Sequence, residues 1–252
     1  MQNSLKGQKA IVVGASRGFG RGIAEAFGRA GAEVLAVGRD GAALAELARG
    51  HPGLQVEIAD AADPSTARQV LDRHPARILA VVAGATPVHR PLHHHTWETF
   101  STNWHADVRI AFQWVGEALR LPLAPGSVVI VMSSGAALVG SPLSGGYAGA
   151  KATVRFISAY AAQESEQAGL GITFKVVLPR LSPATDLGRT AVAAYAARAG
   201  MSEERFSADL GPAVTPEVAG AAFVRLALLE AGDEAREFTL TGAGLLPLVP
   251  AA

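Results

Sequence analysis

The chain has 252 residues, of which 49% are hydrophobic, and its 22 basic side chains balance its 22 acidic ones. The hydrophobic fraction is sufficient for a packed core, which excludes a disordered chain, and the balanced charge gives no overall field for nucleic acid or an anionic membrane. The chain has no cysteine, so disulfides, thiolate nucleophiles and cysteine-ligated metal sites are excluded.

Residues 1–9 do not resemble an export signal, and no segment is expected to be apolar enough for a membrane. Residues 1–9 are polar, whereas a secretory signal needs an uninterrupted apolar stretch. A bilayer span needs roughly 18 apolar residues, and runs such as 128–132 are soon broken by serine and glycine. We therefore expect a soluble protein of the cytoplasm.

Short apolar or β-branched segments alternate with longer amphipathic ones along the chain. The expected strands are residues 10–13, 33–37, 54–58, 77–82, 127–132, 172–178 and 237–240. The expected helices are residues 20–30, 42–48, 64–73, 97–121 and 147–168. This alternation predicts an α/β fold with a parallel sheet and right-handed crossovers. No repeat or linker divides the chain, so we expect a single domain over residues 1–252.

Two regions lack the alternation. Residues 180–216 carry prolines and irregular signals, which predict a mobile flap over a substrate site. The tail, residues 245–250, is apolar and too rich in proline for a helix. We expect this tail to pack against the sheet edge or a neighbouring subunit.

A glycine-rich turn follows the first expected strand and opens directly into a helix. It reads Gly14-Ala15-Ser16-Arg17-Gly18-Phe19-Gly20, with the spacing Gly-x3-Gly-x-Gly. Glycine lets the backbone approach a phosphate, while a helix N-terminus offers unpaired N–H groups and a positive dipole end. The turn is therefore expected to bind dinucleotide phosphates. A tight strand-to-helix connection without a ligand is the alternative.

The end of the second expected strand bears on which dinucleotide binds. A protein that binds NAD places a carboxylate there for the ribose hydroxyls, but this chain has Gly38 followed by Arg39. Arg17 and Arg39 offer two guanidinium groups to a 2′-phosphate, which favours NADP(H) over NAD(H). The alternative is that both are ordinary surface arginines.

Tyr147 and Lys151 form a Tyr-x3-Lys pair in a chain with three tyrosines and four lysines. Chance would give roughly 0.05 such pairs in a chain of this composition. At positions i and i+4 of a helix the ammonium lies near the phenol and would lower its pKa, so that the tyrosine exchanges a proton near neutral pH. Ser134 follows the strand at 127–132 and is expected to hydrogen-bond a substrate oxygen.

Together these motifs resemble those of the classical short-chain dehydrogenase/reductase family over nearly the whole chain. The matches are the glycine-rich turn, Ser134 thirteen residues before Tyr147, and Tyr147-x3-Lys151. The resemblance implies a Rossmann-like doubly wound sheet of seven strands and hydride transfer between a nicotinamide and a carbonyl or secondary alcohol. The resemblance also implies that Tyr147 is the general acid/base, that Lys151 binds the nicotinamide ribose, and that Ser134 orients the substrate.

The resemblance also implies cofactor contacts outside the turn. These are Asp60 and Ala61 near the adenine, Ala83 and Gly84 after the fourth strand, and Pro179 after the sixth. Two positions depart from the family pattern. Val81-Val82 stands where the family has two asparagines, one of which braces the sheet. Arg180 stands in place of a glycine. Its side chain is expected to contact an acidic substrate or the cofactor phosphates, or else to face solvent.

The family's fourth catalytic residue, an asparagine on the long middle helix, has two candidates here. Counting forward from Trp97 gives Asn103, and counting back from Ser134 gives Asp107. They lie one turn apart and can share a helix face. Both stay open, as does the possibility that neither has the role.

We predict an NADP(H)-dependent oxidoreductase for a small or medium carbonyl or alcohol substrate, assembled as a homodimer or homotetramer. The alternatives are a nucleotide-binding regulator without turnover, and an epimerase or dehydratase that uses hydride transfer transiently. Neither a nucleic-acid nor a membrane partner is expected. His89 and His93-His94-His95 predict a solvated loop rather than a metal site, because adjacent histidines do not converge easily on one ion.

Overall fold

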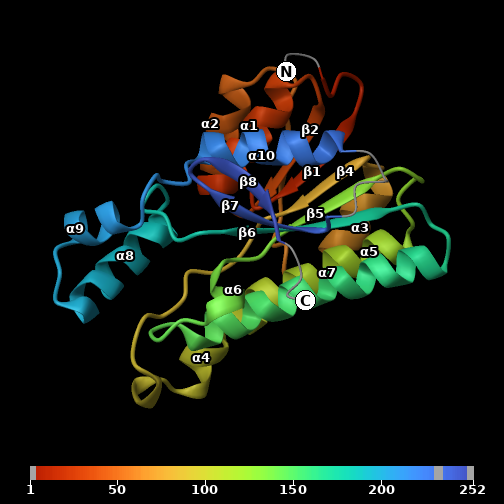
Figure 1. The fold of residues 1–252 in the computed structure, drawn as a ribbon. Coiled ribbons are helices and arrows are strands. Elements are labelled where there is room, and N and C mark those ends of the chain that lie inside the picture. Colours follow the sequence, from red (N-terminus) through yellow and green to blue (C-terminus); the bar gives the residue numbers. More distant parts are fainter. Residues whose placement is uncertain (1–3, 230–234, 249–252) are drawn as a thin grey trace.

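A computed structural model describes residues 4–229 and 235–248, which form a sheet between two layers of helices (Figure 1). The strands are β1 (Lys9–Val13), β2 (Glu33–Gly38), β3 (Gln55–Ile58), β4 (Ile78–Val81), β5 (Val128–Met132), β6 (Thr173–Pro179), β7 (Glu237–Thr241) and β8 (Gly244–Pro247). Their order is β3-β2-β1-β4-β5-β6-β7-β8, and each pair is parallel except β7 with β8. The predicted doubly wound α/β fold is confirmed.

Helices cover both faces of this sheet (Figure 1). One layer contains α1 (Gly18–Arg29), α2 (Gly41–Gly50) and α10 (Pro216–Leu228), and the other contains α3 (Thr66–Arg73), α5 (Arg109–Arg120) and α7 (Gly145–Gln167). Alternate strand residues therefore enter two cores: Val12 packs with Phe27 on one face, and Val13 packs with Trp114 on the other. Burial on both faces is why the strands are nearly continuous apolar runs.

The prediction of seven strands is wrong by one, because the tail adds β8. Thr241 pairs with Gly244, so residues 242 and 243 form a two-residue hairpin connection. The backbone at Gly244 has a φ of 114°, which a residue with a side chain rarely adopts. The tail thus packs at the sheet edge, one of the two expected positions; its last predicted residues, 249 and 250, lie outside the described residues.

The long helix expected at 97–121 is divided into three parts. They are α4 (Trp97–Asn103), a π-helical turn (Trp104–Val108) and α5. A π-helical turn holds one more residue than an α-helical turn, and such turns are frequent at functional sites. The division places Asn103 and Asp107 at the two ends of an irregular segment.

Residues 180–216 are more regular than predicted. They contain α8 (Asp186–Ala199) and α9 (Glu203–Asp209), which project from the body beyond β6 (Figure 1). Thr185 caps α8 by accepting a hydrogen bond from Gly188 N, and Ser202 caps α9 by accepting one from Arg205 N. The prolines at 183 and 212 lie outside both helices and Pro216 begins α10, so none of them interrupts a helix.

Within the described ranges, no helix has both the length and the apolar character that a membrane crossing requires.

Candidate active site

Lys151 lies at the centre of a buried cluster below the carboxyl end of the sheet. Its Nζ is 3.1 Å from Asp107 Oδ2 and donates a hydrogen bond of 3.1 Å to Met132 O. The side chains of Lys151 and Asp107 are only 7% and 1% exposed. The same Nζ lies 5.8 Å from the centre of the Tyr147 ring. The ammonium is thus shared between a carboxylate, a backbone carbonyl and the face of the phenol.

Tyr147 lies in the first turn of α7, with its phenol in a strongly charged surrounding. Burial raises the pKa of Tyr147, while Lys151 and a hydrogen bond with Ser134 oppose the rise and Asp107 and Tyr195 add to it. The prediction of a lowered pKa is therefore wrong. Burial is the main reason, because it disfavours the charged phenolate more than Lys151 stabilises it, and the carboxylate of Asp107 adds to the rise. The phenol keeps its proton at neutral pH.

The pKa of Lys151 is also raised. Burial alone would lower it, but the charge of Asp107 and the nearby phenol of Tyr147 outweigh the loss of hydration, and the bond with Asp107 adds to them. The amine therefore carries its positive charge across the physiological pH range.

Both candidates for the fourth catalytic residue lie in this cluster. Asp107 Oδ1 accepts a hydrogen bond of 2.8 Å from Ala85 N and one of 3.2 Å from Asn103 Nδ2. Asn103 Nδ2 also donates to Ala85 O at 2.7 Å. Asp107 contacts Lys151 directly, whereas Asn103 contacts Asp107 and the segment after β4. The π-helical turn brings both side chains to Ala85.

The two serines after β5 point to different partners. Ser133 is buried and donates a hydrogen bond of 2.8 Å to Lys151 O, which fixes α7 against the strand. Ser134 is partly exposed on the side of Tyr147, and its Oγ accepts a hydrogen bond from Ala136 N at 3.2 Å. Ser134 is thus the serine whose hydroxyl is open to a ligand.

The glycine-rich turn brings its backbone very close to neighbouring segments. A Cβ on Gly14, whose φ is 94°, would lie 2.6 Å from Ala83 N. A Cβ on Gly20 would lie 2.0 Å from Gly14 O. Gly38 at the end of β2 packs on Ser16, with 3.5 Å between its ideal Cβ position and the serine Cβ. Side chains larger than hydrogen are excluded at Gly14 and Gly20, because the turn packs closely on itself and on the segment after β4.

The cations expected near this turn are both accessible. Arg17 is the N-cap residue of α1, and its side chain does not cap the first N–H groups of the helix. Arg17 and Arg39 are exposed, and neither forms an ion pair with any residue in the described ranges. Two guanidinium groups therefore border the start of α1 and the end of β2.

The other predicted cofactor residues follow neighbouring strands at the same edge. Asp60 is exposed after β3, and the carbonyl of buried Ala61 accepts a hydrogen bond of 3.1 Å from the Trp114 indole. Gly84 has a second role, because a Cβ there would lie 2.7 Å from Asp107 Oδ2. Pro179 O accepts a hydrogen bond of 2.9 Å from Gly135 N.

Several residues near the site carry no clear sequence signal. Thr185 packs its methyl group 3.6 Å from the ideal Cβ position of Gly18, so the cap of α8 borders the phosphate turn. Its position before a helix was the one available sign. Tyr195 on α8 bonds to Ser141 and Ser144, and only the folded chain brings these residues together. Arg180 is exposed, with its backbone N bonded to Leu240 O.

The histidine run reaches this cluster only through His95, which lines a small cavity with Asn103 and Tyr147. His93 and His94 are exposed in a 3-10 turn (Leu92–His94), and His95 contacts Thr99 through Nδ1 at 3.1 Å. Over residues 4–229 and 235–248, no group of three metal-ligating side chains gathers.

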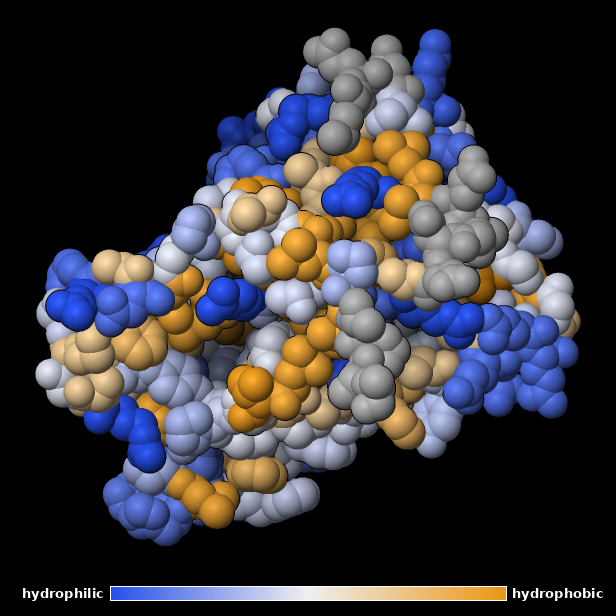
Figure 2. Space-filling view, in the orientation of Figure 1, coloured by the Kyte–Doolittle hydropathy of each residue, from blue (hydrophilic) through white to orange (hydrophobic). Residues whose placement is uncertain are grey.

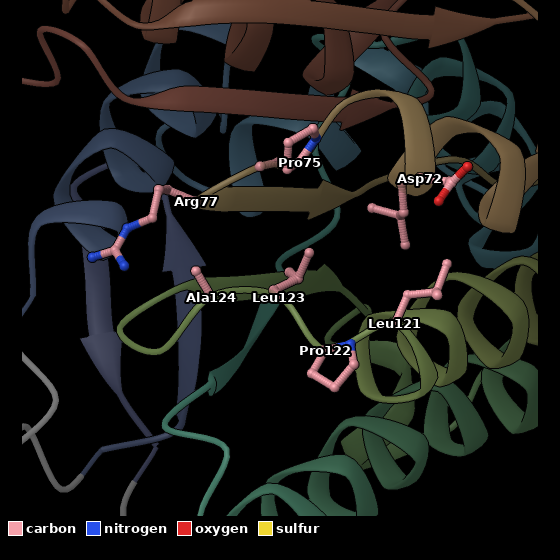
Figure 3. A pocket seen from close by; sticks show the side chains of 9 residues that line it. Asp72, Pro75, Arg77, Leu121, Pro122, Leu123 and Ala124 are labelled. Carbon is pink, nitrogen blue, oxygen red and sulfur yellow. The ribbon is translucent and has the colours of Figure 1, made fainter.

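Two pockets lie at opposite ends of the sheet. A small cavity beside Tyr147, too narrow in this structure to hold a water molecule, is lined by Pro87, Val88, His95, Thr99, Phe100, Asn103, Ser144 and Gly146. Figure 2 shows the surface hollowed between the projecting α8–α9 segment and the body of the molecule. The larger pocket, about 370 Å³ and open, precedes β4 and β5 (Figure 3). The charged residues of this pocket, Asp72 and Arg77, lie on different sides of it (Figure 3). The Arg77 guanidinium donates a hydrogen bond to Pro125 O, so the two side chains do not form a catalytic cluster.

Comparisons with known proteins agree with this geometry. A family model described as short chain dehydrogenase matches residues 8–196. Bovine (Bos taurus) L-xylulose reductase is 36% identical over 137 residues, which are 53% of this chain and 56% of that protein. Pig (Sus scrofa) carbonyl reductase [NADPH] 2 is 30% identical over 136 residues, again 53% of this chain and 56% of that protein. The match spans little more than half the length of these curated relatives.

A solved structure shows the same fold over almost the whole chain. It is the Pseudomonas aeruginosa RhlG/NADP active-site complex, which superposes with a TM-score of 0.79. The two chains are 24% identical, and the superposition covers 96% of this chain and 98% of that one. This likeness extends past residue 196, where the family match ends.

Proposed function

This chain belongs to the short chain dehydrogenase family, and we propose that it is an NADP(H)-dependent oxidoreductase acting on a carbonyl or secondary alcohol of a small or medium organic substrate. The observation that carries the proposal is the buried cluster in which Lys151 joins Asp107 to the ring of Tyr147. Such a cluster, at the edge where open α/β sheets bind ligands, provides a proton donor with a fixed positive charge beside it.

Each residue of the cluster has a separate task in this proposal. Ser134 would hold the carbonyl oxygen by a hydrogen bond, and Tyr147 would donate its proton to that oxygen during reduction. Lys151 would stabilise the phenolate that remains, because its ammonium lies close to the ring. Asp107 keeps Lys151 charged, and Asn103 holds Asp107 in place. Oxidation of an alcohol would use the same proton path in reverse.

The residues around the glycine-rich turn fit a nicotinamide dinucleotide. The backbone of Gly14, Gly18 and Gly20 at the start of α1, with the neighbouring Ser16, Phe19 and Thr185, would bind the pyrophosphate. The adenine would lie near Asp60 and Ala61, and the nicotinamide near Ala83, Gly84 and Pro179. When bound, the dinucleotide would supply or accept the hydride. Lys151 would bind the nicotinamide ribose.

The functional test is an assay of carbonyls with NADPH and of alcohols with NADP⁺, followed by the absorbance of the reduced nicotinamide. We expect oxidation of NADPH with at least one small carbonyl. Binding of NADPH without oxidation across a broad panel would favour the regulator instead. A product that keeps the oxidation state of its substrate would favour an epimerase or dehydratase.

Preference for NADP(H) rests on Arg17 and Arg39, and two of the similar proteins carry NADPH or NADP in their names. Replacing Arg39 by alanine removes a charge-assisted contact to the 2′-phosphate. Because such bonds contribute about 1.5–3 kcal/mol, KM for NADPH should rise about ten- to a hundredfold while KM for NADH changes little. The measurement is the ratio of kcat/KM for the two dinucleotides.

Arg49→Ala is the matched control, since Arg49 is an exposed arginine in the last turn of α2, away from the phosphate turn. It should leave the ratio as in the unaltered protein. An unchanged ratio in Arg39→Ala would mean that Arg39 has no role in cofactor choice.

We also propose that the protein forms a homodimer or homotetramer through α5 and α7. These helices lie side by side on the outer surface (Figure 1). With the adjoining π-helical turn they expose four aromatic side chains, Trp104, Phe112, Phe156 and Tyr160, at 40%, 58%, 58% and 55%. Large aromatic side chains in such positions are typical of subunit interfaces.

A further inference from the structure

Three hydroxyl side chains from two distant segments meet at the mouth of the site. Ser141 and Ser144 lie between α6 (Ala136–Val139) and α7, with their Oγ atoms 2.7 Å apart. Tyr195, on α8, hydrogen-bonds with Ser141, and its Oη is 3.3 Å from Ser144 Oγ. We call these three residues the hydroxyl clasp. It ties α8, in the expected flap, to the beginning of the catalytic helix.

The hydroxyl clasp borders Tyr147. Ser144 is the N-cap residue of α7 and is 4% exposed, so it precedes Tyr147 by about one turn of helix. Ser144 and Tyr147 line the same small cavity. The Oη of Tyr195 is close enough to Tyr147 to contribute to the raised pKa of that phenol. A substrate whose carbonyl oxygen is held by Tyr147 would therefore place its neighbouring atoms next to the clasp.

The three side chains of the clasp carry no charge, and the rings that pack on Tyr195 are neutral. The Tyr195 ring meets the edge of His89 at 6.0 Å and stacks on Phe206 of α9 at 6.4 Å. Burial lowers the pKa of His89, so this ring is neutral at neutral pH. The adjacent Arg90 directs its guanidinium to His94 O. A carboxylate or phosphate would find no opposite charge in the clasp, whereas a neutral hydroxyl finds both donors and acceptors.

The spacing limits where on the substrate such a hydroxyl lies. Ser144 is the N-cap residue of α7, three positions before Tyr147, and both line the same small cavity. A polar group bonded to the clasp would therefore lie close to a carbonyl oxygen held by Tyr147. Resting on the proposed oxidoreductase function, we propose that the hydroxyl clasp determines specificity, with Tyr195 as its central residue, and selects ketones and aldehydes that carry a hydroxyl on the carbon next to the carbonyl.

The test compares two ketones of equal size. Hydroxyacetone and butanone differ by a hydroxyl in place of a methyl group, and their kcat/KM values with NADPH are measured for the whole protein. The unaltered protein should prefer hydroxyacetone. Tyr195→Phe removes one neutral hydrogen bond and should lower the ratio of the two kcat/KM values about tenfold. An unchanged ratio, or an equal loss for both ketones, would overturn the proposal.

Two further variants separate specificity from folding. Tyr160→Phe removes the same atom from a tyrosine that is 55% exposed on α7, thirteen residues beyond Tyr147, and should keep the ratio. Ser141→Ala removes a different hydroxyl of the clasp and should lower the ratio as Tyr195→Phe does. A ratio that falls equally in Tyr160→Phe would also overturn the proposal.

The proposed function and the clasp can fail separately. If the unaltered protein reduces neither ketone, the oxidoreductase proposal fails for these substrates, and calorimetry of the same ligands with the NADP⁺-loaded protein decides the clasp. Tighter binding of hydroxyacetone than of butanone, lost in Tyr195→Phe, would support it. Equal binding of the two ligands would overturn it.

Discussion

Replacing Tyr147 by phenylalanine is expected to lower kcat for carbonyl reduction by about 10²–10⁴-fold, the usual contribution of a positioned general acid. The substitution removes the phenolic oxygen but keeps the ring that Lys151 contacts at 5.8 Å. Ser134 alone would still orient the carbonyl but would provide no acid with an adjacent ammonium. Steady-state kinetics with NADPH and the best substrate of the carbonyl panel measure the loss.

The loss should reside in the chemical step. Binding of NADPH to Tyr147→Phe, followed by fluorescence, should stay within about threefold of the unaltered protein, because one neutral hydrogen bond contributes only about 1 kcal/mol. Tyr160→Phe serves again as the matched control. Full turnover in Tyr147→Phe would remove this residue from the mechanism.

The largest effect on stability is expected at Asp107. Replacing it by alanine leaves the Lys151 ammonium buried with a carbonyl but no carboxylate, and leaves Ala85 N without its acceptor. Breaking a buried ion pair on one side costs about 3–5 kcal/mol, so the free energy of unfolding should fall by that amount. Urea denaturation followed by circular dichroism measures it.

A comparison of three variants shows whether the charge is the cause. Asp107→Asn keeps an acceptor for Ala85 N, so its free energy of unfolding should fall less than that of Asp107→Ala. The double variant Asp107→Leu with Lys151→Met removes both charges and should recover stability relative to Asp107→Ala, because apolar replacement of a buried pair is often neutral. If Asp107→Ala lowers the free energy of unfolding by less than about 1 kcal/mol, Asp107 and Lys151 are not a tightly coupled pair.

Asp107→Asn has a second readout in the pH profile. Asp107 raises the pKa of both Tyr147 and Lys151, so removing its charge should lower both and move the alkaline loss of reductase activity to lower pH. The free energy of unfolding is also expected to fall as the pH rises. Both pKa values are raised in the folded protein, so the stability they contribute is present below their unfolded values near 10 and is lost as pH rises through the folded values.

The sheet was predictable from sequence for a physical reason. Strands such as β1 and β5 are buried on both faces, which requires continuous apolar runs that end where the burial ends. The glycine-rich turn and the Tyr147–Lys151 pair were also predictable, because both depend on spacing within one segment. The structure places them along the same edge of the sheet.

Features that depend on distant segments were not predictable. The division of the helix at 97–121 comes with bonds that Asn103 and Asp107 make to Ala85, which no periodicity reveals. The upward shift of the Tyr147 pKa comes mainly from burial, with a smaller contribution from Asp107, and both are properties of the folded chain. The sequence does not predict α8 and α9, because the prolines near their ends resemble breaks inside the segment.

The π-helical turn also affects how residue positions are counted along this helix. A turn with one additional residue shifts the angular position of every later side chain by about 100°, the angle per residue in an α-helix. A helical wheel drawn from Trp97 therefore assigns the wrong face to α5, and one drawn back from Arg120 assigns the wrong face to α4. Numbering schemes carried across residues 104–108 from proteins with an unbroken helix lose their register at this point.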